Sequence, residues 1–218
     1  MMLNGYDSDK MFEYENGFHI TSTESRFGKF LAHYELYKKI IELPGQIVEC
    51  GVFKGNSFFR LAYFRNLLES INSRKIIGFD IFGEFPKTEF EDDKTYLERF
   101  VTSAGKNSIE IKEMRKALNY KGIKNYELIK GDINQTVPEY CINNPQLKIS
   151  LLHIDTDVYE PAVTILDNFY DKVVRGGVIM FDDYGTFPGE TKAVDDFFAS
   201  LRINKLSISH IPSYIIKP

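Results

Sequence analysis

The segment that decides the fold is residues 149–160, Ile-Ser-Leu-Leu-His-Ile-Asp-Thr-Asp-Val-Tyr-Glu, together with residues 176–184, Gly-Gly-Val-Ile-Met-Phe-Asp-Asp-Tyr. Each contains an apolar run that ends in carboxylates. Apolar runs of about five residues with little alternation are typical of strands covered on both faces, as in a parallel sheet. Ligands of such sheets bind beyond the carboxyl ends of the strands. If the two strands are neighbours, their terminal acids form one site: Asp155, Asp157, Asp182 and Asp183.

Strand and helix patterns alternate along the rest of the chain. Strands are predicted at 46–51, 75–80, 125–132, 148–154 and 173–182. Helices are predicted at 23–42, 57–70, 110–119, 136–141, 158–170 and 190–201. This order predicts an α/β fold with a doubly wound, mostly parallel seven-stranded sheet and helices on both faces. Two short strands at 206–209 and 214–216 predict a C-terminal antiparallel hairpin added to the sheet.

The predicted domain organisation is simple. Residues 23–218 form a single domain, which at this size buries about 70% of the surface of the unfolded chain and needs no metal or disulfide to fold. Residues 1–22 mix acids, aromatics and glycines without a clear period, and we expect an N-terminal arm or lid. Residues 84–107 are acid-rich with apolar residues at helical spacing, which predicts a lid insertion over the strand ends.

Composition restricts the classes of partner. The formal net charge is -4 and the basic residues are scattered, so we expect neither nucleic acid nor a membrane as a partner. The two cysteines, Cys50 and Cys141, have no metal-cluster spacing and fit a reducing cytoplasm. No signal-peptide core or apolar run of about 18 residues is present, so a cytoplasmic protein is expected. Aromatic residues of the arm, such as Phe12 and Phe18, could pack in a homo-oligomer.

A glycine-containing turn at 49–57 connects the first long strand to a helix. Glycine lets the backbone pass close to a ligand, and the free N–H groups of the helix favour a polar or anionic group. The turn lacks a full G-x-G-x-x-G pattern, because Phe53 and Lys54 stand where a pyrophosphate turn has small residues. It is therefore either a cofactor contact or an ordinary strand-to-helix connection.

Single acids follow two other strands. Asp80 ends the second strand, where an acid commonly holds ribose hydroxyls, although it could also cap a helix. Asp132 follows the third strand and could meet an adenine edge or cap the next helix. Both acids are candidate cofactor contacts.

The acids that follow the strands at 148–154 and 173–182 are the stronger indication of a functional site. Asp155, Asp182 and Asp183 together concentrate negative charges that repel unless a cation or protons offset them. Hard oxygen ligands of this kind suit Mg²⁺. The alternative is that Asp183 caps a turn and Asp157 caps the following helix. His153 lies on the same strand face as Asp155 but inside an apolar run, which is more typical of a hydrogen-bonded core histidine.

Four ordered motifs resemble those of the macrocin O-methyltransferase family, whose founding members methylate sugar hydroxyls on macrolide antibiotics. They are Val-Glu-Cys-Gly-Val at 48–52, Gly-Phe-Asp-Ile-Phe-Gly-Glu-Phe-Pro at 78–86, His-Ile-Asp-Thr-Asp-Val-Tyr-Glu at 153–160 and Gly-Gly-Val-Ile-Met-Phe-Asp-Asp-Tyr-Gly at 176–185. Residues 15–18 and 25–30 are similar as well, so the resemblance spans roughly residues 13–198.

The resemblance implies a Rossmann-like class I methyltransferase fold that uses S-adenosylmethionine and a divalent metal, Mg²⁺ or another cation. Carried over to this chain, Glu49 and Gly51 border the methionine part of the cofactor and Asp80 holds its ribose. Gly55, Ser57 and Asp132 complete the predicted cofactor contacts, and the predicted metal ligands are Asp155, Asp182 and Asp183.

The implied reaction is Mg²⁺-assisted methylation of a hydroxyl on a sugar or glycosylated small molecule. Coordination to the metal favours the alkoxide, and Asp155 or Asp157 is the predicted catalytic acceptor of its proton. Three alternatives stay open: a catechol acceptor, a nucleotide-dependent oxidoreductase, and a non-catalytic cofactor-binding protein on the same fold. The acceptor stays open too, because the chain is shorter than expected for the antibiotic-tailoring members.

Overall fold

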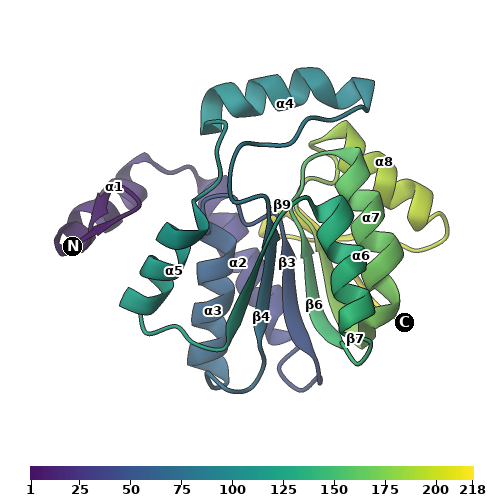
Figure 1. Cartoon of the computed structure of the whole chain (residues 1–218), viewed down its shortest axis with the longest axis horizontal. Coiled ribbons are helices and arrows are strands. Elements are labelled where there is room, and N and C mark those ends of the chain that lie inside the picture. Colours follow the sequence, from purple (N-terminus) through teal and green to yellow (C-terminus); the bar gives the residue numbers. More distant parts are fainter.

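The computed structural model describes residues 1–218 (Figure 1). Its strands are β1 Met2–Leu3, β2 Tyr6–Asp7, β3 Gln46–Cys50, β4 Ile76–Asp80, β5 Tyr126–Lys130, β6 Ile149–Ile154, β7 Val173–Phe181, β8 Asn204–Leu206 and β9 Ser209–Ile216. Its α-helices are α1 Met11–Thr21, α2 Glu24–Lys38, α3 Asn56–Leu68, α4 Glu91–Ala104, α5 Ile111–Tyr120, α6 Ile133–Asn143, α7 Tyr159–Phe169 and α8 Pro188–Phe197. Short 3₁₀ turns lie at Ser8–Lys10 and Tyr170–Lys172.

The central sheet has seven strands in the order β5-β4-β3-β6-β7-β9-β8. The five strands from β5 to β7 are parallel, whereas β9 is antiparallel to β7 and β8 is antiparallel to β9. The predicted doubly wound sheet and its terminal hairpin are therefore confirmed, but the hairpin turn lies at 207–208, within the first predicted strand, and residues 209–216 form one continuous strand. The chain runs outward from β3 to β5 and returns to β6 on the other side of β3, so the strand order reverses between β3 and β6. Ligands of open α/β sheets bind at this kind of position.

Two apolar layers cover the sheet because successive residues of each strand point to opposite faces. On one face, Val48 and Leu152 pack with α6, α7 and α8; on the other, Ile47 and Leu151 pack with α2, α3 and α5 (Figure 1). Continuous burial along β4 and β6 explains why apolar residues predominate in these strands and do not alternate with polar ones. Glu49 and His153 point to the α2 side by the same alternation, which places polar groups inside the second layer.

The N-terminal segment contains secondary structure that its sequence pattern did not indicate. Residues 1–22, for which the sequence showed no period, form the β1–β2 hairpin and the helix α1 beside α5 (Figure 1). The backbone N–H of Asn4 donates to the Glu113 carboxylate of α5 at 3.2 Å. No residue of α1 is buried. An amphipathic period arises from burying one helix face, and α1 buries none, so its sequence lacks the pattern that marks helices such as α5 and α7.

The segment 84–107 lies between β4 and α5 in the chain. It contains α4, which lies across the carboxyl ends of the strands, and it is closed at its base by a β-bridge between Glu84 and Asn107 (Figure 1). Three other helices differ in length from the prediction, of which α2 ends at Lys38 rather than at residue 42. The α6 helix begins at Ile133 because Asp132 caps it, and α8 ends at Phe197 rather than at residue 201. None of the helices combines the length and apolarity that a membrane crossing requires.

Candidate active site

A cavity of about 640 Å³ opens at the carboxyl ends of β3, β4, β6 and β7. Its floor contains residues of the glycine turn, including Gly51 and Ser57, and the acids that follow the strands. Phe85 and Phe100 of the 84–107 segment line it from above. The structure therefore brings most of the predicted site residues to one enclosed space.

The neighbouring strands β6 and β7 place the late acids together, as predicted. Asp155 follows β6 and Asp182 follows β7, and the Asp182 N–H donates to the Ile154 carbonyl oxygen at 2.9 Å. Carboxylate oxygens of Asp155, Asp182 and Asp183 all lie within 4.8 Å of one another. The Oδ2 atom of Asp183 is buried and has no hydrogen-bond partner.

Burial and mutual repulsion shape the charges of this acid cluster. Burial and the nearby Asp182 raise the pKa of Asp155 to about 7. Burial and the neighbours Asp157 and Asp155 raise the pKa of Asp183 well above its usual value. Burial alone would raise the pKa of Asp182, but Lys29 and hydrogen bonding to His153 hold it well below its usual value. Without a bound cation, protons on some carboxyls reduce the repulsion.

Two further acids border the cluster. Asp157 lines the cavity in the left-handed region, at φ 62°, which Asp tolerates better than most residues. Glu190 of α8 accepts the Asp183 N–H at 2.9 Å with one oxygen and leaves its other oxygen buried without a partner. Burial and the Asp183 charge raise the pKa of Glu190 well above its usual value. The sequence analysis did not identify Glu190.

His153 is a buried, hydrogen-bonded histidine, as expected, and it also supports the acids. Its Nδ1 lies 3.1 Å from Oε1 of Glu49, and its Nε2 lies 3.4 Å from Oδ1 of Asp182. Burial alone would lower the pKa of His153, but hydrogen bonds to both carboxylates outweigh it and raise the pKa to about 10. The charged imidazole therefore joins the two acids beneath the cavity floor.

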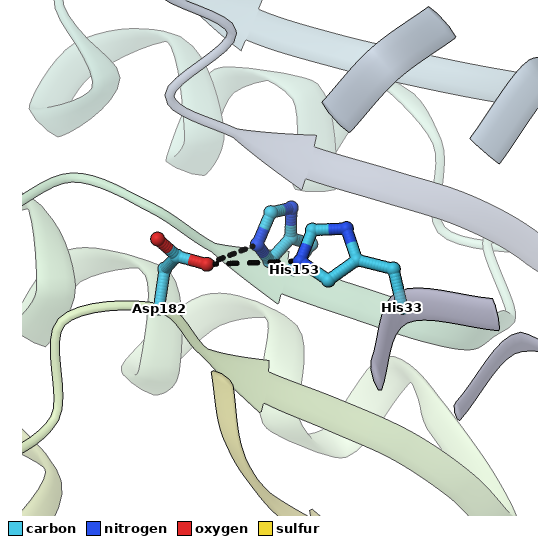
Figure 2. A group of neighbouring side chains, drawn as sticks. All are labelled: His33, His153 and Asp182. Atoms are coloured by element: carbon cyan, nitrogen blue, oxygen red, sulfur yellow. Dashed lines mark hydrogen bonds and ion pairs between the residues drawn. The ribbon is translucent and has the colours of Figure 1, made fainter. Parts of the chain in front are cut away.

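Helix α2 contributes two residues that the sequence analysis missed. Nε2 of His33 lies 3.8 Å from the same Asp182 oxygen that His153 approaches, and the two imidazoles meet edge to face with centroids 5.1 Å apart (Figure 2). Burial lowers the pKa of His33 to about 3, so this ring is neutral. One turn earlier, the Lys29 ammonium pairs with Oδ2 of Asp182. Their spacing of four residues places both on one helix face, but nothing local shows what that face meets.

Asp80 lines the cavity, and its carboxylate already accepts hydrogen bonds from groups of the chain. Its Oδ2 accepts the N–H groups of Val52 and Phe53, each at 2.9 Å, so it holds the glycine turn. Its Oδ1 accepts the Phe82 N–H at 2.5 Å and the Ser108 hydroxyl at 2.7 Å. A carboxylate accepts about four hydrogen bonds, so its predicted role with ribose requires a ligand to displace one of these donors.

The remaining predicted cofactor contacts divide into two groups. Gly51, Ser57 and Asp132 line the cavity, and Asp132 also caps α6 by accepting the Asn134 N–H at 2.9 Å. Glu49 and Gly55 do not line it. Glu49 is buried against His153 because the two residues are paired in register across β3 and β6, and Gly55 lies behind the turn at the start of α3.

The donor set fits a divalent cation. Six carboxyl groups form the cluster, and the cationic side chains in contact with them are those of Lys29 and His153, so the remaining acids need protons or a bound cation to offset their charges. The acids are Glu49, Asp155, Asp157, Asp182, Asp183 and Glu190. The unpartnered Asp183 oxygen and the exposed face of Asp155 are hard ligands of the kind that Mg²⁺ prefers.

One buried carboxylate fastens the 84–107 segment above the cavity. Oδ2 of Asp93, in the first turn of α4, accepts the Tyr159 N–H at 2.9 Å, and Oδ1 accepts the Gly189 N–H at 2.7 Å. These donors belong to the first turns of α7 and α8, and neither helix has a side-chain cap of its own. Asp93 therefore caps two helices at once and joins them to α4.

We predict that Asp93→Ala lowers the free energy of unfolding by about 3 kcal/mol, because two buried N–H groups lose a charged acceptor. The melting temperature should fall by about 6–12 °C, measured by calorimetry. Asp92→Ala is the matched control, since Asp92 is the exposed acid next to Asp93 in the same helical turn. Equal melting temperatures for the two variants would contradict the double-cap interpretation.

A family model described as macrocin-O-methyltransferase matches residues 32–213. The chain belongs to this family. A curated member of similar sequence, a demethyldecarbamoylnovobiocin O-methyltransferase from Streptomyces niveus, is 28% identical over 171 residues. That alignment covers 74% of this chain and 61% of the relative, so the chain spans about six tenths of the length of that relative.

Solved structures with the same fold include two methyltransferases. The calicheamicin methyltransferase CalS11 superposes with a TM-score of 0.76 at 24% identity, covering 98% of this chain and 88% of that one. Its apo structure, described as a TDP-rhamnose 3′-O-methyltransferase, gives 0.68 at 25% identity over 98% and 89% of the two chains. The O-methyltransferase NovP gives 0.75 at 20% identity, covering 87% and 79%. This family member therefore has the Rossmann-like class I methyltransferase fold.

Proposed function

We propose that this chain is an S-adenosylmethionine-dependent O-methyltransferase that uses a divalent cation and methylates a sugar hydroxyl. The observation that carries the proposal is the group of three carboxylates from β6 and β7, which faces the glycine turn across one cavity. Family membership supports the transfer reaction. The description of CalS11 as acting on TDP-rhamnose supports a nucleotide sugar as the first acceptor to test.

The proposal assigns different roles to the residues of the site. Asp155, Asp182 and Asp183 would hold the cation, and Asp157 lies beside them in the cavity, where it can accept the proton of the acceptor hydroxyl. When bound, the cation would lower the pKa of a coordinated hydroxyl, and S-adenosylmethionine would supply the methyl group. Phe85 and Phe100 cover the cavity and limit the access of water to it.

We also infer that the 84–107 segment is a lid. Besides the Asp93 contacts, Oε1 of Glu160 on α7 accepts the N–H groups of Glu89 at 2.8 Å and Phe90 at 3.0 Å. The Phe90 ring stacks on Tyr159 with centroids 5.0 Å apart. These contacts hold residues 89–93 against α7 and α8, and the Glu84–Asn107 bridge joins the two ends of the segment, so the lid would release the contacts of Glu160 and Asp93 when it opens for a ligand.

The position of Arg60 on α3 supports a binding site for the carboxylate group of the cofactor. It lines the cavity near the end of β3, its guanidinium lies 5.5 Å from the centre of the Phe30 ring, and it has no ion pair with the chain. Because ribose and adenine are assigned to β4 and β5, the methionine part of the cofactor would extend toward β3 and meet Arg60.

We predict that Arg60→Met weakens binding of S-adenosylhomocysteine about tenfold, because a charge-assisted contact is lost. Binding of 5′-methylthioadenosine, which lacks the amino acid group, should not change. Calorimetric titration of both ligands measures the difference. Arg99→Met is the control, since Arg99 belongs to α4 and does not line the cavity. Equal losses for both ligands would argue against a carboxylate contact.

The proposed function is tested by two measurements on the purified protein. Calorimetry should show that S-adenosylhomocysteine binds with Mg²⁺ and also with a chelator. Transfer of labelled methyl from S-adenosylmethionine to TDP-rhamnose should then occur with Mg²⁺ and stop with the chelator. Absence of cofactor binding would reject the methyltransferase assignment, and methylation that is insensitive to the chelator would reject the cation. Methylation of a catechol but not of a sugar would instead support the phenolic acceptor.

A further inference from the structure

Lys29 occupies an unusual position for a lysine. Its side chain is 13% exposed, it lines the cavity, and its ammonium pairs with Oδ2 of Asp182, one of the three proposed cation ligands. A lysine ammonium is charged at neutral pH, and this one lies directly against a carboxylate. The ammonium therefore remains charged inside the acid cluster.

The fold places Lys29 there through close packing of α2. A Cβ atom on Gly28 would lie 2.5 Å from the carbonyl oxygen of Ile208, so only glycine lets α2 approach the β8–β9 turn this closely. The same approach brings His33 to Oδ1 of Asp182 (Figure 2). Helix α2 thus covers both oxygens of this carboxylate, one with a cation and one with a neutral imidazole.

An ammonium on Asp182 and a divalent cation on the same carboxylate oppose each other. Like charges a few ångströms apart in a partly buried site repel strongly, because water screens them less there than at the surface. A divalent cation that is coordinated by the Asp182 carboxylate must therefore displace the Lys29 ammonium from it. The lysine stem is long and flexible, and the side chain already borders the cavity, so the ammonium has space to move into.

We propose that Lys29 is an internal counter-cation, which neutralises Asp182 in the metal-free protein and competes with the divalent cation for this carboxylate. The inference rests on the cation of the proposed function and adds a determinant of its affinity. It assigns Lys29 as a positioning residue that keeps the acids together before the cation arrives. When the cation binds, the ammonium moves from Asp182 to the cavity wall, which Lys29 already lines.

The test measures Mn²⁺ binding by electron paramagnetic resonance in the wild type and three variants. Lys29→Met should bind Mn²⁺ about tenfold more tightly, which corresponds to about 1.4 kcal/mol, because the competitor is gone. Lys29→Arg keeps the charge and should stay close to the wild type. Lys87→Met removes a different lysine that lines the cavity and should also stay close to it, which controls for the loss of charge alone.

Each outcome decides between the two proposals. Unchanged or weaker Mn²⁺ binding in a folded Lys29→Met variant overturns the competition while the cation site stands. Absence of Mn²⁺ binding in every protein overturns the cation site and the inference together. If Lys29→Met does not fold, a second experiment on the wild type tests the same inference. A cation that displaces the Lys29 ammonium from Asp182 should make this lysine more reactive, so Mn²⁺ should increase the rate of chemical acetylation of Lys29 relative to Lys87 by several-fold. Peptide mass spectrometry measures this ratio, and an unchanged ratio overturns the inference.

Discussion

Asp155→Asn is expected to reduce kcat/KM for methyl transfer about a thousandfold, equivalent to about 4 kcal/mol of transition-state stabilisation. Asp155 is the least buried of the three clustered carboxylates and faces the cavity directly after β6. The variant removes a charged ligand from the proposed cation site, so Mn²⁺ affinity should fall together with the rate. Stability should not fall, because burial and repulsion already disfavour the charged form of Asp155 in the metal-free protein.

Two comparisons make this prediction specific. Binding of S-adenosylhomocysteine should stay within about threefold of the wild type, which separates loss of the cation site from loss of the fold. Asp195→Asn is the matched control, because Asp195 is an exposed acid on α8 that accepts the Tyr184 hydroxyl at 2.8 Å outside the main cavity. The Asp195→Asn variant should have the same kcat/KM for methyl transfer as the wild type. Full activity of the Asp155→Asn variant would show that Asp155 has no essential role in the reaction.

Gly51→Ala is expected to have the largest structural effect of any single substitution at the site. Gly51 has a φ of +92°, and a Cβ atom there would lie 1.7 Å from the carbonyl oxygen of Asp155. The clash is with backbone, so it cannot be relieved by turning a side chain. We expect a loss of more than about 4 kcal/mol of stability, with a fall in melting temperature of at least about 8 °C or a loss of soluble protein.

Gly185→Ala separates the close approach from the backbone conformation. Gly185 has a φ of +82° but no atom within 4 Å of the position its Cβ would take. Alanine there should cost only about 1–2 kcal/mol, the usual penalty for a left-handed residue. The difference between the two variants measures how tightly the end of β3 is packed against the residue after β6. Equal losses would show that the contact contributes nothing.

The strands and the acids that end them were predictable from the sequence because their cause is local. A strand buried on both faces is apolar along most of its length, so β4, β6 and the second half of β7 form nearly continuous apolar runs, and the carboxylates at their ends mark where each strand stops. The positions of Asp155 and Asp182 follow directly. The α1 helix escaped prediction for the converse reason, since a helix without a buried face has no apolar period.

The sequence by itself therefore determined the α/β class, the order of the strands along the chain and the acidic edge of the sheet. Only the tertiary structure decided what surrounds that edge. Lys29 meets Asp182 across 153 residues, and Asp93 caps α8 across 96. Such contacts depend on how α2 and α4 pack against the sheet, and a lysine or an aspartate on a helix has the same local sequence signature whether it faces solvent or a buried carboxylate.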